Sequence, residues 1–170
     1  MSKKRLSQDR WIEAGLSALA EHGASVLSVE SLCREQGISK GSFYWHFRDL
    51  QDFHAQLSSS WKRSAASDLV AALEHQGPVA TRLQMIAAIT PAEREMRAWA
   101  RSNDAAAAQV TEIDRLRLDA TAALLRDLGI SNPDLARALY AAAIGLDALP
   151  DRPADDHAME TLVDLMLALR

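Results

Sequence analysis

The segment SVESLCREQGISKGSFYWHF, residues 28–47, decides the fold because it reads as two short helices joined by a tight turn. Val29, Leu32 and Cys33 recur at helical spacing and give the first of these helices one apolar face. Gly37 can take the left-handed conformation that ends a helix, so the chain turns there. We therefore predict a helix-turn-helix motif.

Serine residues are placed to begin both helices of this motif. Ser28 is a suitable N-cap for the first helix, and Ser39 is suitable for the second, which we expect over residues 40–47. Phe43 and Phe47 are four residues apart and must share a face, which we expect to point inward. The rest of the helix surface then carries Tyr44, Trp45 and His46.

The second helix has residues that suit a nucleic-acid surface. Its first turn combines the cation of Lys40, the absent side chain of Gly41 and the small hydroxyl of Ser42. The three ring-bearing residues after Phe43 can donate hydrogen bonds to phosphate or lay their faces on sugars and thymine methyls. A purely internal aromatic cluster is the alternative, but three adjacent helical positions cannot all face inward.

These residues resemble the DNA-binding domain of TetR-family transcriptional regulators. The pattern G-[IV]-S-x-G-[ST]-[LF]-Y-x-H-F is carried here by Gly37, Ile38, Ser39, Gly41, Ser42, Phe43, Tyr44, His46 and Phe47. The likeness extends back to a first helix from Trp11 and forward into a long helix after Asp49. It implies an all-α fold of about nine helices, in which a three-helix DNA-binding domain is joined by a long fourth helix to a C-terminal helical bundle.

The sequence departs from the family at one position. Relatives usually carry a phosphate-binding lysine early in the fourth helix, whereas this chain has Leu50. The contact is therefore either lost or taken over by Arg48. With Arg48 included for this reason, the predicted DNA-binding residues are Ser28, Glu30, Ser39, Lys40, Gly41, Ser42, Tyr44, Trp45, His46 and Arg48.

The predicted contacts differ in what they read. Lys40 is expected to contact a base, with guanine the best match, and Ser42 and the backbone near Gly41 to approach a base edge or phosphate. The rings of the second helix are expected to hold the sugar-phosphate backbone, and Ser28 to bring a helix N-terminus to a phosphate. Glu30 either accepts from cytosine N4 or is a solvent-exposed acid in the first turn of its helix.

Composition and charge fit this interpretation. The net charge is −4, but residues 1–63 hold nine Lys or Arg against seven Asp or Glu, a balance of +2, and the rest of the chain is acidic. Lys3, Lys4 and Arg5 form a basic arm that either crosses a phosphate backbone or enters a minor groove, or else is a solubilising tail.

The remaining composition excludes several classes of protein. The single cysteine, Cys33, rules out an internal disulfide and a cysteine-based zinc cage, and we expect it to be a core residue, with redox sensing as the alternative. No stretch reaches the roughly 18 consecutive apolar residues of a membrane span, and no signal peptide is evident, so we expect a cytoplasmic protein. No metal or cofactor is predicted.

Helical periodicity continues to the end of the chain, and no strand alternation appears. Beyond a first helix over 7–22, we expect helices over about 49–76, 78–89, 91–102, 104–128, 132–149 and 155–169. We place the domain boundary between a DNA-binding domain, 1–50, and an effector-binding and dimerisation domain, 51–170.

The last two helices are more apolar than surface helices need to be. Small residues permit close helix approach, so we predict a four-helix interface between two subunits, which the resemblance also implies; packing within one subunit is the alternative. The predicted interface residues are Leu135, Leu139, Ala142, Ala143, Leu146, Leu162, Leu165, Met166 and Leu169.

An effector cavity is expected between the long fourth helix and the bundle, as in relatives. Its predicted lining is Trp61, Met85, Met96, Trp99 and Tyr140, although large residues at this spacing also make ordinary cores. No catalytic motif is present: Glu93, Glu95, Glu112, Asp114, Asp119 and His157 fall mostly on predicted solvent faces.

The sequence therefore predicts a homodimeric DNA-binding regulator that binds a pseudo-palindromic operator. The family resemblance implies that it is a repressor and that a small-molecule effector releases it from the operator. Two alternatives remain open, a dimeric DNA binder without an effector and a helical protein-interaction module. No enzyme activity is predicted.

Overall fold

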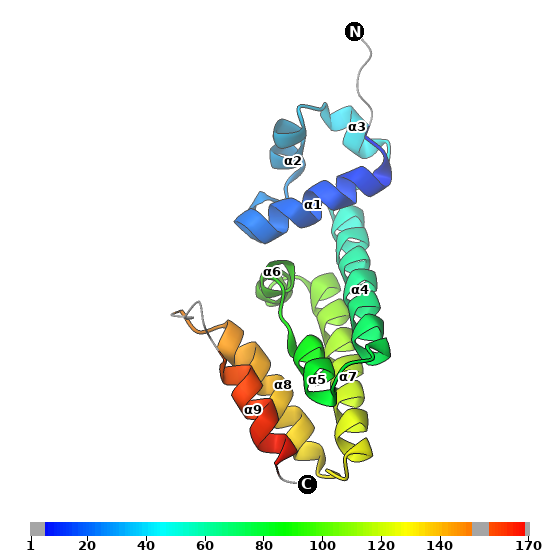
Figure 1. Ribbon diagram of the computed structural model, residues 1–170. Helices are drawn as coiled ribbons and strands as arrows, with labels where there is room; N and C mark the ends of the chain where they lie inside the picture. Colours follow the sequence, from blue (N-terminus) through cyan, green and yellow to red (C-terminus); the bar gives the residue numbers. More distant parts are fainter. Residues whose placement is uncertain (1–5, 151–156, 169–170) are drawn as a thin grey trace. The chain divides into compact units, whose positions relative to one another are not determined.

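The computed structural model describes residues 6–150 and 157–168, and within them every regular element is a helix (Figure 1). The all-α prediction is confirmed. The arm at residues 3–5 and Leu169 of the predicted interface lie outside the described residues. The elements are α1 (Gln8–His22), η1 (Ala24–Val26), α2 (Val29–Gln36), α3 (Lys40–Tyr44), α4 (Leu50–Glu74), α5 (Val79–Ala87), α6 (Pro91–Ala100), α7 (Asp104–Asp127), α8 (Pro133–Asp147) and α9 (Ala158–Leu167).

Local capping explains why α2 begins and ends where it does. The Ser28 hydroxyl accepts from the Ser31 backbone N–H at 3.2 Å, which satisfies one donor of the first turn. Gly37 then takes the left-handed conformation, with φ of 63°, and the Ile38 N–H donates to the Cys33 carbonyl at 2.9 Å. The predicted start and stop of this helix are confirmed.

Helix α3 is shorter than predicted. It ends at Tyr44, and the Phe43 carbonyl then accepts from both the His46 and Phe47 N–H groups, at 2.9 and 3.0 Å. Beyond this turn the Arg48 N–H donates at 3.0 Å to the carboxylate of Asp52, in the first turn of α4. Ser39 does stand at the N-cap position of α3, but its side chain makes no capping hydrogen bond.

The chain forms two compact units. The first comprises the described residues up to Arg63 together with Thr90–Val110, and the second comprises Ser64–Ile89 together with the described residues from Thr111 onward. The first unit therefore contains α1 to α3 and also α6, which lies far along the sequence. This grouping differs from a single division after residue 50.

Four aromatic side chains build the centre of the first unit. Trp11, Phe43, Phe47 and Phe53 are each at most 1% exposed. The centroid of Phe43 lies 5.5 Å from Trp11 and 5.0 Å from Phe47, and Phe47 lies 5.0 Å from Phe53. Such edge and tilted arrangements are favourable for aromatic pairs. The cluster fixes α3 against α1 and α4. The prediction that Phe43 and Phe47 point inward is confirmed.

The first unit also contains an ion pair whose carboxylate is buried, although Glu93 was predicted to lie on a solvent face. Glu93 is 1% exposed, and its Oε1 accepts from Arg97 Nη2 at 2.7 Å and from Nε at 3.0 Å. The prediction of a solvent-facing Glu93 is therefore wrong. Arg97 lies one helical turn later, so α6 satisfies its own buried carboxylate and can pack closely against α1.

The second unit has a separate apolar core between α5, α8 and α9. Leu83, Ile86, Leu139, Val163 and Met166 are all at most 5% exposed within it. The described parts of α4 and α7 that belong to this unit add further leucine and alanine side chains. The apolar side chains of the C-terminal helices are thus largely buried inside this unit.

Helices α1 and α4 approach closely at Gly15. A Cβ atom added there would lie 2.6 Å from Leu57 Cδ1 and 2.7 Å from Phe53 Cζ. We expect Gly15→Ala to lower the free energy of unfolding by about 1–2 kcal/mol, because the cost of overpacking outweighs the gain in helix propensity. Urea denaturation measures this. Gly41→Ala is the control, since its Cβ would meet only Ser39 Oγ at 3.9 Å; equal losses in both variants would contradict the close-packing explanation.

Candidate nucleic-acid interface

Helix α3 and the turn after it present rings and a cation to solvent. Tyr44 and Trp45 are 55% and 72% exposed, and Lys40 is exposed one turn earlier. Phe43 between them is fully buried. The predicted division between an internal and an external face is therefore confirmed. Large exposed aromatic side chains are uncommon on a surface with no ligand, so this face is the candidate binding surface.

Lys40 forms an ion pair with Glu30 across the helix-turn-helix motif. The Nζ atom of Lys40 donates to Glu30 Oε1, and both side chains are more than half exposed. This hydrogen bond lowers the pKa of the Glu30 carboxyl and raises the pKa of the Lys40 ammonium. Glu30 is thus paired with Lys40, the residue proposed to contact a base. The sequence analysis did not predict this pair, because the two residues are ten positions apart.

His46 is tied to the start of the chain. Its Nε2 lies 2.8 Å from the carbonyl oxygen of Leu6, and it donates there when Nε2 carries the proton. The ring is half-buried, unlike its neighbours Tyr44 and Trp45. Leu6 directly follows the basic residues of the arm, so His46 anchors the backbone at the point from which that arm departs. Sequence spacing gave no sign of this contact.

Arg48 is available where the family lysine is missing. Its backbone N–H donates to Asp52 Oδ2 at 3.0 Å, which with a bond from Gln56 lowers the pKa of the Asp52 carboxyl. The Arg48 side chain is 85% exposed, and its Nε reaches the same oxygen only at 3.5 Å. Leu50 is half-buried. The geometry is compatible with Arg48 taking over the lost phosphate contact, which stays a prediction.

The small residues of the motif lie around the same face. Ser28 caps α2 and is half-buried, whereas Ser39 and Gly41 are exposed. The Ser42 Oγ is buried and has no hydrogen-bond partner among the described residues. Side-chain rotation would have to bring it to a ligand. Cys33 is 5% exposed, and burial raises the pKa of its thiol, which supports a core role rather than a reactive thiolate.

The predicted effector residues belong to both compact units. Trp61, Met96 and Trp99 are buried in the first unit, where Trp99 stacks edge-on with His54. Met85 and Tyr140 belong to the second unit, where Met85 is 39% exposed and the Tyr140 hydroxyl donates to Asp114 at 2.8 Å. The predicted lining stays untested.

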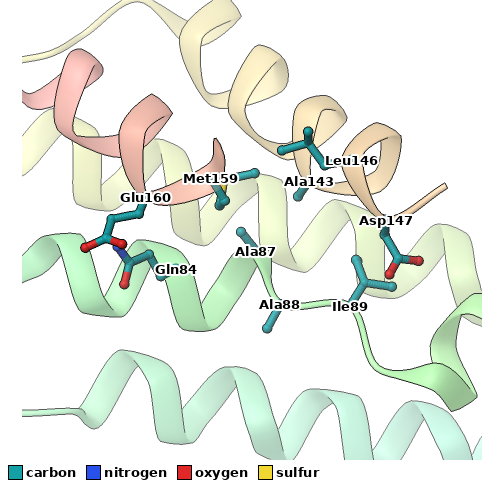
Figure 2. A pocket seen from close by; sticks show the side chains of 9 residues that line it. All are labelled: Gln84, Ala87, Ala88, Ile89, Ala143, Leu146, Asp147, Met159 and Glu160. Carbon is teal, nitrogen blue, oxygen red and sulfur yellow. The ribbon is translucent and has the colours of Figure 1, made fainter. Parts of the chain in front are cut away.

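The second unit contains a different pocket of about 250 Å³ between α5, α8 and α9 (Figure 2). None of the predicted effector residues lines it. Two residues of the predicted dimer interface, Ala143 and Leu146, do. The full lining is Gln84, Ala87, Ala88, Ile89, Ala143, Leu146, Asp147, Met159 and Glu160.

The predicted dimer residues divide between core and surface. Leu139, Ala143 and Met166 are at most 5% exposed, because their side chains complete the second unit, and they are not accessible to a partner. Leu165 is 65% exposed, and the remaining described members are half-buried, namely Leu135, Ala142, Leu146 and Leu162. The sequence reading did not separate the inward from the outward stripe of α8 and α9.

Within residues 6–150 and 157–168, no helix combines the length and apolar character needed to cross a membrane. No cluster of three or more His, Cys, Asp or Glu side chains in those ranges is arranged to bind a metal ion.

Comparison with known proteins finds a family model that matches the motif. The model of bacterial regulatory proteins, tetR family, matches residues 12–53, which span the helix-turn-helix and the start of α4. A search of the curated proteins gave no match. The chain is thus a protein of the helix-turn-helix class.

Solved structures share the fold over almost the whole chain. A transcriptional regulator from Rhodococcus sp. Rha1 is similar with a TM-score of 0.75 at 19% identity, covering 96% of this chain and 95% of that one. The multidrug binding protein EbrR, complexed with imidazole, gives 0.63 at 20%, covering 96% of each. A TetR/AcrR-family transcriptional regulator from Thermobifida fusca YX-ER1 gives 0.60 at 18%, covering 94% and 96%. The resemblance to TetR-family transcriptional regulators is confirmed, and the chain has their fold.

The Glu30–Lys40 ion pair makes a pH prediction. Because the pKa of Glu30 is lowered in the folded protein, the pair stabilises the fold above the carboxyl's unfolded pKa, and this contribution is lost as pH falls through the folded pKa. We expect the pKa of the Glu30 carboxyl, followed by NMR, to lie below its ordinary value of 4.5, and Lys40→Ala to return it towards that value. Arg34→Ala, which removes an exposed cation from the same helix, is the control. An unchanged titration in Lys40→Ala would contradict the pairing.

Proposed function

We propose that the protein is a homodimeric, sequence-specific DNA-binding regulator, a repressor that leaves its operator when a small-molecule effector binds. The observation that carries this proposal is the surface of α3, where exposed Lys40, Tyr44 and Trp45 stand on a buried aromatic base. A rigid helix that offers a cation and rings suits entry into a major groove. The tetR family match over the same residues supports it.

Within that interface, Lys40 is the proposed base-reading residue. Its partner Glu30 holds the ammonium between α2 and α3, and Glu30 is released, or accepts from cytosine N4, when Lys40 reaches guanine. Tyr44, Trp45 and Arg48 are proposed to hold the sugar-phosphate backbone. His46 is proposed to act indirectly, by fixing Leu6 so that the basic arm starts beside α3.

The proposed dimer face is the outward stripe of α8 and α9. On α8 it consists of small exposed residues at helical spacing, and just past the end of that helix it includes Leu149, which is 57% exposed. On α9 it is centred on Leu165, which is 65% exposed. Two such helix pairs can form a close four-helix contact that covers both leucines. The small exposed residues of the α8 stripe are Ala138, Ala141, Gly145 and Ala148.

Release by an effector is proposed from fold and relatives together. EbrR, which has a similar fold, is a multidrug binding protein complexed with imidazole. This chain has a pocket in its second unit, whereas a ligand-insensitive DNA binder needs none. An alternative, recognition of a protein partner by the exposed Trp45, predicts a different dependence on salt.

Binding of the purified protein to DNA from upstream of its own gene tests the proposal across a salt series. We expect affinity to fall steeply with salt, because phosphate contacts release counterions. Lys40→Ala should weaken discrimination at one base pair by roughly 1–3 kcal/mol. Arg126→Ala, which removes an exposed cation of α7, should leave discrimination unchanged.

Three results would contradict parts of this account. Equal loss on all sequences would make Lys40 a phosphate contact. A folded protein with no sequence-specific binding, either to this DNA or to fragments selected from the genome, would reject the regulator. Binding that is indifferent to salt would favour the protein-interaction alternative.

A further inference from the structure

The backbone at Leu6 is held beside the helix-turn-helix motif. His46 lies in the turn that follows α3, and its Nε2 is 2.8 Å from the Leu6 carbonyl oxygen. One residue after Leu6, Ser7 caps α1, where its hydroxyl accepts from the Arg10 N–H at 3.3 Å. The start of α1 and the end of α3 are therefore side by side (Figure 1). Leu6 is a fixed point of the chain next to the proposed DNA-binding surface.

The positive charge of the N-terminal third comes from the three residues just before that point. Residues 1–63 hold nine Lys or Arg against seven Asp or Glu, and Lys3, Lys4 and Arg5 are three of those nine. Residues 6–63 thus hold six cations against seven acids, a balance of −1. Neutralising phosphates with cations supplies most of the sequence-independent affinity of a protein for DNA. Without the basic arm, the part of the chain that carries the helix-turn-helix is slightly acidic.

Part of the remaining charge is already neutralised within the first unit. An Arg10 guanidinium nitrogen lies 3.8 Å from a carboxylate oxygen of Glu13, and Lys40 is paired with Glu30. The basic arm, by contrast, is a run of three cations with no acid between them or next to them in the sequence. Short basic segments of this kind, attached to a DNA-binding domain, are typical of arms that contact nucleic acid.

Chain geometry limits how far the arm can reach from Leu6. An extended chain spans at most about 3.6 Å per residue, so the backbone of Lys3 lies within roughly 11 Å of Leu6, and long cationic side chains add to that reach. A helix that enters the major groove has a minor groove directly beyond the bordering phosphate backbone. That groove is only about 6 Å wide, which suits an extended segment with Lys and Arg side chains.

The minor groove offers these cations a simple distinction between base pairs. A·T pairs present only acceptors there, whereas a G·C pair adds the guanine N2 amino group as a donor. A·T-rich stretches also have a narrow groove, whose enhanced negative potential attracts Arg and Lys. Contacts to the phosphate backbone alone would use the same charge but would show no such preference.

We propose that the basic arm enters the minor groove beside each major-groove half-site and selects A·T pairs there, and that His46 is the residue that positions it. This inference rests on the proposed function and extends it to bases that the helix-turn-helix does not reach. His46 acts through the Leu6 carbonyl, so that the arm starts from the same place beside α3 in every complex.

Binding of the full-length protein to operator duplexes that differ only in their flanks tests the proposal. The base pairs beside each half-site are made A·T, G·C or inosine·cytosine, because inosine keeps the major-groove edge of guanine but lacks its N2 amino group. We expect G·C flanks to weaken binding about fivefold or more, and inosine·cytosine flanks to restore it.

The double variant Lys4→Ala, Arg5→Ala should lose this flank preference. It should also lower the slope of log affinity against log salt by about 2 for each subunit, because two cations no longer displace counterions. The matched control is Arg115→Ala with Arg126→Ala, which removes two exposed cations of α7 from the second unit and should retain both the preference and the slope.

Two variants of His46 separate positioning of the arm from a direct contact with DNA. His46→Ala removes the donor to Leu6 and should abolish the flank preference, whereas His46→Gln keeps a side-chain N–H and should retain it. Adding Lys4→Ala and Arg5→Ala to His46→Ala should reduce the preference no further, since both changes act on one element. Circular dichroism confirms that each variant is folded.

Several results would overturn the proposal. Equal binding to G·C and inosine·cytosine flanks would exclude reading of the guanine amino group. Equal loss on all three flanks in the arm variant would make the arm a phosphate contact, and no change in affinity or salt slope would make it a solubilising tail. A folded His46→Ala variant that keeps the preference would reject the positioning role. Wild-type protein that binds no duplex specifically would instead reject the proposed regulator itself, and this inference with it.

Discussion

The packing of Phe43 between Trp11, Phe47 and Phe53 is the constraint on which the rest of the first unit depends. Helix α3 has only five residues, too few to be stable alone. Its position is set by a fully buried ring contacted from α1, from α4 and from the turn that follows α3. With Phe43 buried, Tyr44 and Trp45 follow it at positions that are 55% and 72% exposed, and Lys40 is exposed at the start of the helix. One buried ring thus holds the helix that carries the proposed DNA-contacting side chains.

Polar contacts then adjust that surface without building it. The ion pair between Glu30 and Lys40 joins α2 to α3 at an exposed site, where such pairs contribute little to stability. In the proposed function this ion pair acts in recognition, since a lysine held by a carboxylate would meet a base from a defined direction. His46 has a similar role towards Leu6, because it fixes the backbone from which the basic arm begins.

The features that were predicted from sequence are those that neighbouring residues decide. Caps such as Ser28 and Gly37, and the alternation that buries Phe43 and exposes Trp45, follow from local geometry. Contacts between distant residues were missed, including the carbonyl partner of His46. Burial of Glu93 was also missed, because the sequence gives no sign that Arg97, one turn later, satisfies a buried carboxylate. The apolar helices α8 and α9 were misjudged for a related reason. Their exposed faces include small or apolar residues such as Ala141, Gly145 and Leu165, so periodicity alone did not separate core from interface.

The central claim is that two copies of this surface read DNA together. Hydroxyl-radical footprinting of the protein on its operator tests this most directly. The account predicts two protected segments related by twofold symmetry, with centres separated by about 10 base pairs or a multiple of that spacing, because paired recognition helices enter the same face of the duplex. A single protected segment, or uniform protection without symmetry, would contradict it.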